Sequence, residues 1–70
     1  MAMSHQLAMS VALVVLDEIG PEKGEKLLNS LENLVIISKA PESPKQSVIR
    51  VKQAFLILLA GMNKPVGGKS

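Results

Sequence analysis

The stretch that decides the fold, at residues 43–64, reads SPKQSVIRVKQAFLILLAGMNK. Its first residues predict a helix start, because the Ser43 hydroxyl can accept from a backbone N–H that has no partner within the helix. Pro44 falls at the first helical position, where a missing N–H costs nothing, and Gln46 completes a capping box with Ser43. Pro65 ends the helix, because proline disfavours the α conformation of the residue before it.

This predicted helix is apolar on nearly every side. One side carries apolar residues at alternating spacings of three and four, which is typical of a buried helical face: Val48, Val51, Phe55, Leu58 and Met62. The opposite side carries Ile49, Leu56, Ile57 and Ala60. A helix with so little polar surface needs cover on more than one side. We place the core on the line that contains Phe55, the single aromatic residue of the chain.

Upstream, the pattern predicts a first helix over residues 4–19, with Ser4 as its N-cap. Its polar residues fall on one narrow stripe, and the remaining positions are apolar around a wide arc. The run from Val11 to Val15 contains three β-branched residues and is compatible with a buried strand as well. We favour the helix, because a single strand would have no partner of similar quality.

A second helix is predicted over residues 21–39, after a compact junction at Gly20-Pro21. Glycine suits the left-handed position just past a helix end, and proline suits the first turn of the next helix. Gly24 is predicted to be unfavourable within this helix, costing about 1 kcal/mol relative to alanine. One face is apolar and consists of Leu27, Leu28, Leu31, Leu34 and Val35, whereas Ile36 and Ile37 point toward the polar side.

Length and composition predict an all-α protein of three short helices, packed as a small bundle that oligomerisation completes. The chain has 70 residues, of which 47% are hydrophobic and 20% charged. So small a domain has too much surface to hide so many aliphatic side chains within one copy. We assign residues 1–64 to a single helical domain and residues 65–70 to a disordered tail.

The inventory of reactive side chains argues against an enzyme and against a bound cofactor or metal. The chain has no cysteine, and its one histidine, His5, has no acid at a spacing suited to a hydrolase. The ending Gly67-Gly68-Lys69-Ser70 resembles part of a phosphate-binding loop, but it lacks the first glycine and a following helix. The carboxylates near Gly20 lack the interleaved pattern of a calcium loop.

The charge distribution leaves nucleic acid as an alternative partner. Residues 1–38 hold five acids and two lysines, whereas residues 39–70 hold six basic residues and one acid. The basic side chains on or near the third helix that would meet phosphates are Lys45, Arg50, Lys52 and Lys64. They are scattered around the helix, and the chain has no Tyr or Trp for stacking on bases. A dimeric nucleic-acid-binding regulator is therefore the second hypothesis.

The apolar runs do not predict a membrane protein. Each is shorter than the roughly 20 residues that a spanning helix needs. No Lys or Arg precedes the first run, and two acids follow it directly, which does not fit a secretory signal. A membrane-surface peptide would carry more Lys or Arg on one face and usually tryptophan. We expect a cytoplasmic protein.

The remaining class is protein–protein association. We expect a small non-enzymatic interaction module, such as an adaptor, an inhibitor or an assembly subunit. Its partners are expected to be itself, as a homodimer or larger oligomer, and another protein. The apolar residues that the predicted core leaves over form the expected protein-binding site: Ile36, Ile37, Ile49, Leu56 and Ile57.

Overall fold

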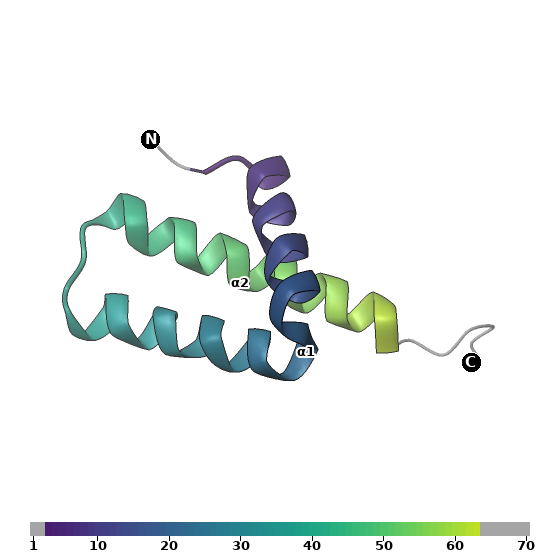
Figure 1. The fold of residues 1–70 in the computed structure, drawn as a ribbon. Helices are drawn as coiled ribbons and strands as arrows, with labels where there is room; N and C mark the ends of the chain where they lie inside the picture. The colour runs from purple at the N-terminus through teal and green to yellow at the C-terminus, as the bar shows by residue number, and fades with distance from the viewer. Residues whose placement is uncertain (1–2, 64–70) are drawn as a thin grey trace.

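The computed structural model describes residues 3–63, and the regular secondary structure in that range is helical throughout (Figure 1). Helix α1 spans His5–Ile37, and α2 spans Glu42–Asn63. The all-α prediction is confirmed, and residues 11–15 belong to a helix rather than a strand. The predicted tail at residues 65–70 lies outside the described residues.

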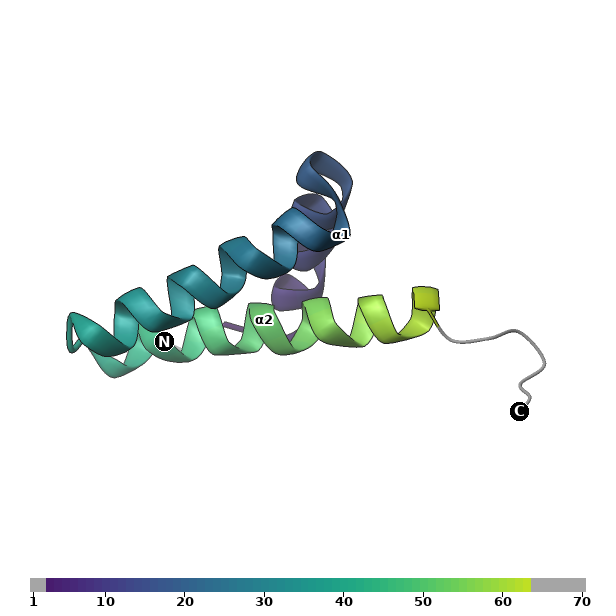
Figure 2. The ribbon, with the colours of Figure 1, turned by 90° about the horizontal axis from the view of Figure 1, so that it is seen from below.

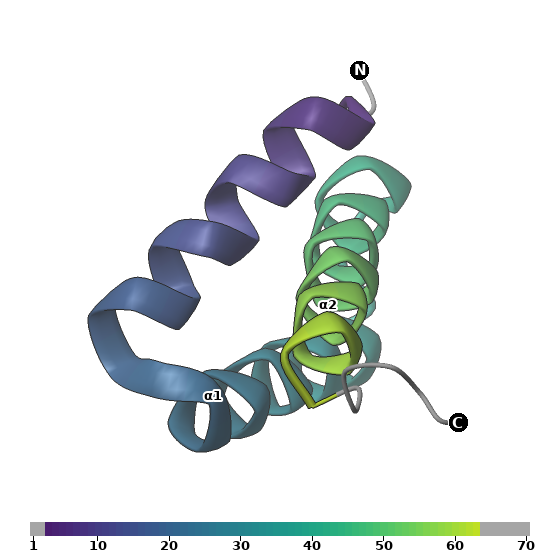
Figure 3. The same ribbon diagram turned by 90° about the vertical axis from the view of Figure 1, so that its right-hand side faces the viewer.

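A sharp bend divides α1 at Gly20, whose φ of 85° and ψ of 171° are not helical. This is backbone that glycine adopts readily and other residues do not. Three separate helices are not confirmed, because the first two predicted segments form one bent helix, although the junction was predicted at the correct residue. We call residues 5–19 the arm, and residues 21–63 the hairpin, in which the rest of α1 runs antiparallel to α2. Figures 1 and 3 show the arm lying across the hairpin.

Both ends of α1 are closed by local hydrogen bonds. The predicted N-cap is confirmed, since the Ser4 hydroxyl accepts from the Leu7 N–H at 3.1 Å. The last turn ends earlier than predicted, because Lys39 adopts a left-handed φ of 55°. This reversal lets the Ala40 N–H donate to the Val35 carbonyl at 3.0 Å, as in a Schellman motif.

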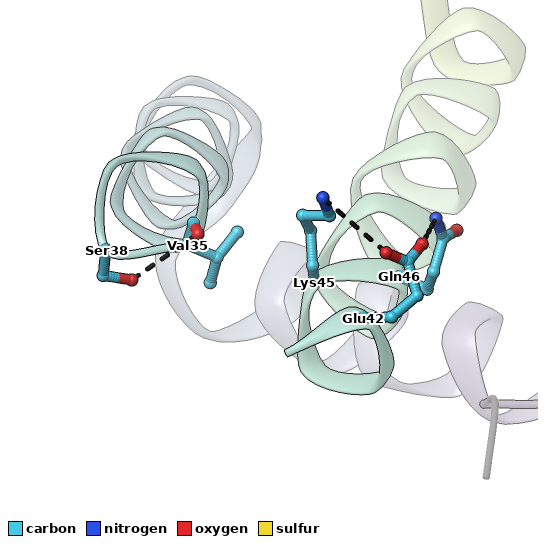
Figure 4. Close-up of polar contacts among 5 residues, drawn as sticks. All are labelled: Val35, Ser38, Glu42, Lys45 and Gln46. Carbon is cyan, nitrogen blue, oxygen red and sulfur yellow. Dashed lines mark hydrogen bonds and ion pairs between the residues drawn. The ribbon is translucent and has the colours of Figure 1, made fainter. Parts of the chain in front are cut away.

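The start of α2 lies one residue earlier than predicted. The helix begins at Glu42, and the Lys45 N–H donates to the Pro41 carbonyl at 3.2 Å. Within this first turn, the Gln46 amide donates to the Glu42 carboxylate at 2.6 Å (Figure 4). The earlier start is possible because no N–H of the first helical turn has an intrahelical partner, so Pro44 is tolerated throughout that turn.

The core lies where the arm crosses the hairpin. Its buried residues come from all three segments: Ala8, Ala12, Leu28, Val51, Ala54 and Phe55. Phe55 is 0% exposed and is the largest fully buried side chain, which confirms it as the centre of the core. Met62 was predicted on the same buried line but is 57% exposed, because it lies near the end of α2, beyond the buried cluster.

The apolar face predicted for residues 21–39 is only partly covered. Leu28 is buried and Val35 half-buried, whereas Leu27, Leu31 and Leu34 are exposed. One antiparallel helix covers a narrow stripe of its neighbour, and the arm does not extend over the loop end of the hairpin in either of two views (Figures 1 and 2). The leucines beside that stripe therefore remain in contact with solvent.

Gly24 allows the three segments to approach one another closely. A Cβ atom at this position would lie 2.5 Å from Cζ of Phe55 and 3.2 Å from a methyl group of Val15. Val15 belongs to the arm and Phe55 to α2, so both pack on the space that the missing side chain leaves. The prediction that Gly24 is unfavourable was wrong, because its cost in helix propensity is offset by the close packing of Phe55 and Val15.

Candidate protein-interaction surface

The feature that stands out is the amount of apolar side chain left exposed on the described part of the chain. Twelve large aliphatic residues of residues 3–63 are exposed, from 36% for Leu31 to 77% for Ile37. They come from the arm, from both helices of the hairpin and from the helix ends: Leu7, Leu13, Val14, Ile19, Leu27, Leu31, Leu34, Ile36, Ile37, Leu56, Ile57 and Met62. Single exposed aliphatics are ordinary, but this many on so small a domain is unusual and marks a candidate interaction surface.

The structure leaves four of the five predicted binding residues exposed: Ile36, Ile37, Leu56 and Ile57. Ile49 is half-buried and contributes less accessible area. Leu56 and Ile57 are successive residues of α2, so their side chains point about 100° apart. Ile36 and Ile37 are separated in the same way on α1. The predicted residues therefore do not form one flat patch but face several directions.

A stripe that the sequence reasoning missed runs along the hairpin part of α1. Leu27, Leu31 and Leu34 are spaced by four and three residues, so they share one side of the helix. Leu34 is the most open of the three, at 60% exposure. The pattern itself was visible in the sequence, but it predicted a buried face. Sequence periodicity shows that a side is apolar, not which neighbour covers it.

The exposed side of the arm was missed for a different reason. Leu7, Leu13 and Val14 remain open to solvent, whereas Ala8 and Ala12 are fully buried in the core. Small side chains let two helices approach closely, so the arm lies against the hairpin along its alanine face. Larger apolar residues of the arm also pack against the core beside the alanines: Met9, Val11, Val15 and Leu16.

Two hollows in the described surface lie at the bend. One, of about 430 Å³, is lined by residues 19–23, and a second, of about 260 Å³, is lined by Pro21, Glu22, Glu25 and Leu59. Within residues 3–63, no three His, Asp or Glu side chains are grouped so that they could hold a metal ion. Neither hollow brings together a nucleophile and a base.

Two of the basic residues considered for nucleic acid are engaged with carboxylates. Lys52 Nζ lies 2.5 Å from Glu32 Oε1, and this ion pair joins the two helices of the hairpin. Lys45 Nζ lies 3.7 Å from Glu42 Oε1 at the start of α2 (Figure 4). Arg50 is exposed, and Lys64 lies outside the described residues. The nucleic-acid alternative therefore stays a hypothesis, with Lys45 and Lys52 paired to carboxylates in the unbound chain.

Neither α1 nor α2, over the residues described, combines the length and the apolarity that crossing a lipid bilayer requires.

Known proteins supply no further guide to this surface. The chain matches no protein-family model, and comparison with curated proteins and with solved structures finds no significant match.

Proposed function

We propose that this chain is a small, non-enzymatic helical interaction module that works as a homo-oligomer and binds another protein. One observation carries the proposal: the described chain fully buries one large side chain, Phe55, and exposes twelve large aliphatic ones. Burying a Leu or Ile side chain completely gains about 1.5–3 kcal/mol. Association that covers only a few of these residues therefore has a substantial driving force to set against the entropy lost on binding.

A second copy of the chain is the first partner to consider. It supplies the same apolar residues on the same helices, and closed two-fold dimers are the commonest form of soluble oligomer. Apolar residues also face several directions, so a dimer interface on one side leaves others for a different protein. The proposal therefore includes both self-association and a second binding partner.

Sedimentation equilibrium on the full chain at micromolar concentration tests the self-association. We expect a mass of at least twice the chain mass of 7.5 kDa. A hydrophobic dye, added to the same samples, reports the apolar surface that remains open in the oligomer. A monomer that binds no dye contradicts the proposal.

Lysine substitutions with a matched control locate the surface that is used. Leu34→Lys and Ile57→Lys place a charge on exposed apolar positions, and Asn33→Lys places it on an exposed polar position that points about 100° away from Leu34 on the same helix. We expect at least one apolar-site variant to weaken association, and the polar-site control to leave it unchanged. Equal effects at apolar and polar positions would show that net charge, rather than apolar contact, governs association.

A further inference from the structure

At Gly20 itself, the bend depends on backbone conformation rather than on side-chain packing. A Cβ atom at Gly20 would have no atom within 4 Å, so no other part of the chain packs on that side of the residue. The hollow of about 430 Å³ at the bend is lined by residues 19–23 alone. At Gly20 itself no side chain fills the bend, although Leu59 of α2 lines the neighbouring hollow. The angle between the arm and the hairpin therefore depends on φ and ψ at Gly20 and on the packing of the arm against the core.

The arm is attached to the hairpin by contacts that any copy of the hairpin can supply. Ala8 and Ala12 enter the core, and Val15 meets the space above Gly24. Among residues 3–63, the ion pair that joins α1 to α2 is Glu32 with Lys52, and both of these residues belong to the hairpin. Apolar packing of this kind is nearly the same whether the arm comes from the same chain or from another.

We propose that two copies of this chain exchange arms to form the dimer. Each α1 opens at Gly20, and its arm packs on the Val51, Ala54 and Phe55 surface of the other copy's hairpin. Exchange of an identical element across a hinge is a low-cost route to a dimer, because the buried contacts of the closed chain are re-formed. The inference rests on the self-association proposed above and adds an exchange of arms to it. Because the exchange re-forms contacts that are already buried in the closed chain, the driving force for association remains the contact between exposed apolar residues of the two copies.

The hinge residues let the chain adopt both forms. Glycine populates positive and negative φ about equally, so the closed bend carries no steric penalty and opening it gains none. Pro21 restricts Gly20 further, since the residue before a proline avoids the α region and favours extended backbone. The open form therefore has an extended or kinked hinge, and the equilibrium depends on which sign of φ residue 20 prefers.

Two alanine substitutions of opposite chirality test the exchange. Gly20→Ala strains the closed bend at φ 85°, whereas Gly20→D-Ala suits it, because a D-residue prefers positive φ. A chain of 70 residues is accessible to chemical synthesis, so both variants can be made at full length. We expect the L-variant to shift the monomer–dimer equilibrium toward dimer by about tenfold or more, and the D-variant to shift it toward monomer to a similar extent.

Gly61→Ala is the matched control, since a Cβ at Gly61 also meets no atom within 4 Å and the residue lies in a regular helix. It should leave the monomer–dimer equilibrium unchanged. If closed copies instead associate through their surfaces, Gly20→Ala weakens the dimer and Gly20→D-Ala strengthens it, and that order overturns the exchange while leaving self-association intact. Equal dimerisation of all four chains also overturns it. A wild-type chain that remains monomeric at every concentration overturns the proposed self-association itself.

Discussion

Gly20 and Gly24 lie one helical turn apart on α1, yet the fold needs glycine at the two positions for opposite reasons. At Gly20 the backbone is unusual and the surroundings are empty, since φ is 85° and an added Cβ would meet nothing within 4 Å. At Gly24 the backbone is helical and the surroundings are full, since an added Cβ would lie 2.5 Å from the Phe55 ring. One glycine determines the direction of the chain, and the other sets how closely the helices approach.

The difference shows which structural roles of a residue can be recognised from its neighbours in the sequence. A glycine followed by proline is a turn signal that depends on neighbouring residues alone, and the bend was predicted from it. A glycine that receives an aromatic ring depends on a residue 31 positions further along the chain. Nothing next to Gly24 in the sequence reveals that contact.

The largest effect we expect comes from removing the ring that Gly24 accommodates. Phe55→Ala deletes the one large side chain that is fully buried among residues 3–63, and such a change typically costs 3–5 kcal/mol through lost burial and the cavity left behind. The total stability of a domain of this size is seldom much greater. We expect the variant to unfold or dissociate, as measured by denaturant titration.

Ile57→Ala is the control for Phe55→Ala, because it introduces the same residue two positions further along the same helix. Ile57 is 56% exposed, so its loss should cost only a few tenths of a kcal/mol in an isolated chain. A cost that depends on protein concentration places Ile57 at an interface between copies. Near-native stability of the Phe55 variant would instead show that the core has been assigned to the wrong side of α2.

Filling the space above Gly24 should have the next largest effect. Gly24→Ala gains about 1 kcal/mol in helix propensity but forces the buried ring to move, and overpacking of this kind costs about 1–3 kcal/mol. We expect a net loss of up to about 2 kcal/mol by denaturant titration. This sign is opposite to the one that helix propensity alone predicts.

A double-mutant cycle with Phe55→Leu identifies the cause of that loss. Leucine lacks the ring atoms that lie 2.5 and 2.9 Å from the added Cβ, so Gly24→Ala should be nearly neutral or stabilising in this background. Residues in contact typically show coupling energies of 0.5–3 kcal/mol, and we expect about 1 kcal/mol or more here. Simple additivity of the two substitutions would mean that the ring does not limit the space at Gly24.

Much of the fold followed from local signals, and most of the errors were tertiary. The Ser4 cap, the Gly20 bend and the position of Phe55 in the core were predicted, because a cap, a turn dipeptide and an apolar period each carry their own mechanism. The leucine stripe at residues 27–34 was predicted to be buried and is not. Whether an apolar side is covered depends on where neighbouring helices lie, and the angle at Gly20 was not available from the pattern.

The candidate surface was predictable in kind but not in extent. An excess of aliphatic residues over available core indicated that some must stay exposed, and Ile36, Ile37 and Ile57 were correctly identified among them. The arm residues were not, because the pattern could not show that alanines would face the hairpin. The alanines take that position because two helices that cross closely need small side chains at the contact.

Lys39 extends the comparison to a position where glycine would be expected but is absent. It adopts φ 55° at the end of α1, in a conformation that costs a residue with a Cβ about 1–2 kcal/mol. Lys39→Gly removes this strain but adds freedom to the unfolded chain, so we expect a net gain of about 0.5–1 kcal/mol. Thermal and denaturant unfolding should both show the increase, and a loss would mean that the lysine side chain stabilises the loop.

Gly61 provides the reference for both of the other glycines, and we expect the smallest effect there. It lies in the last turn of α2 with ordinary helical backbone, and an added Cβ would meet nothing within 4 Å. Neither strain nor crowding opposes Gly61→Ala, so only helix propensity remains. In a helix interior this substitution gains about 0.5–1 kcal/mol, and a position so near the helix end should gain less. Denaturant titration beside Gly24→Ala measures the two under the same conditions. A gain at Gly61 with a loss at Gly24 isolates the contribution of the Phe55 ring, whereas a loss at both positions would mean that the last turn of α2 is packed against a second copy of the chain.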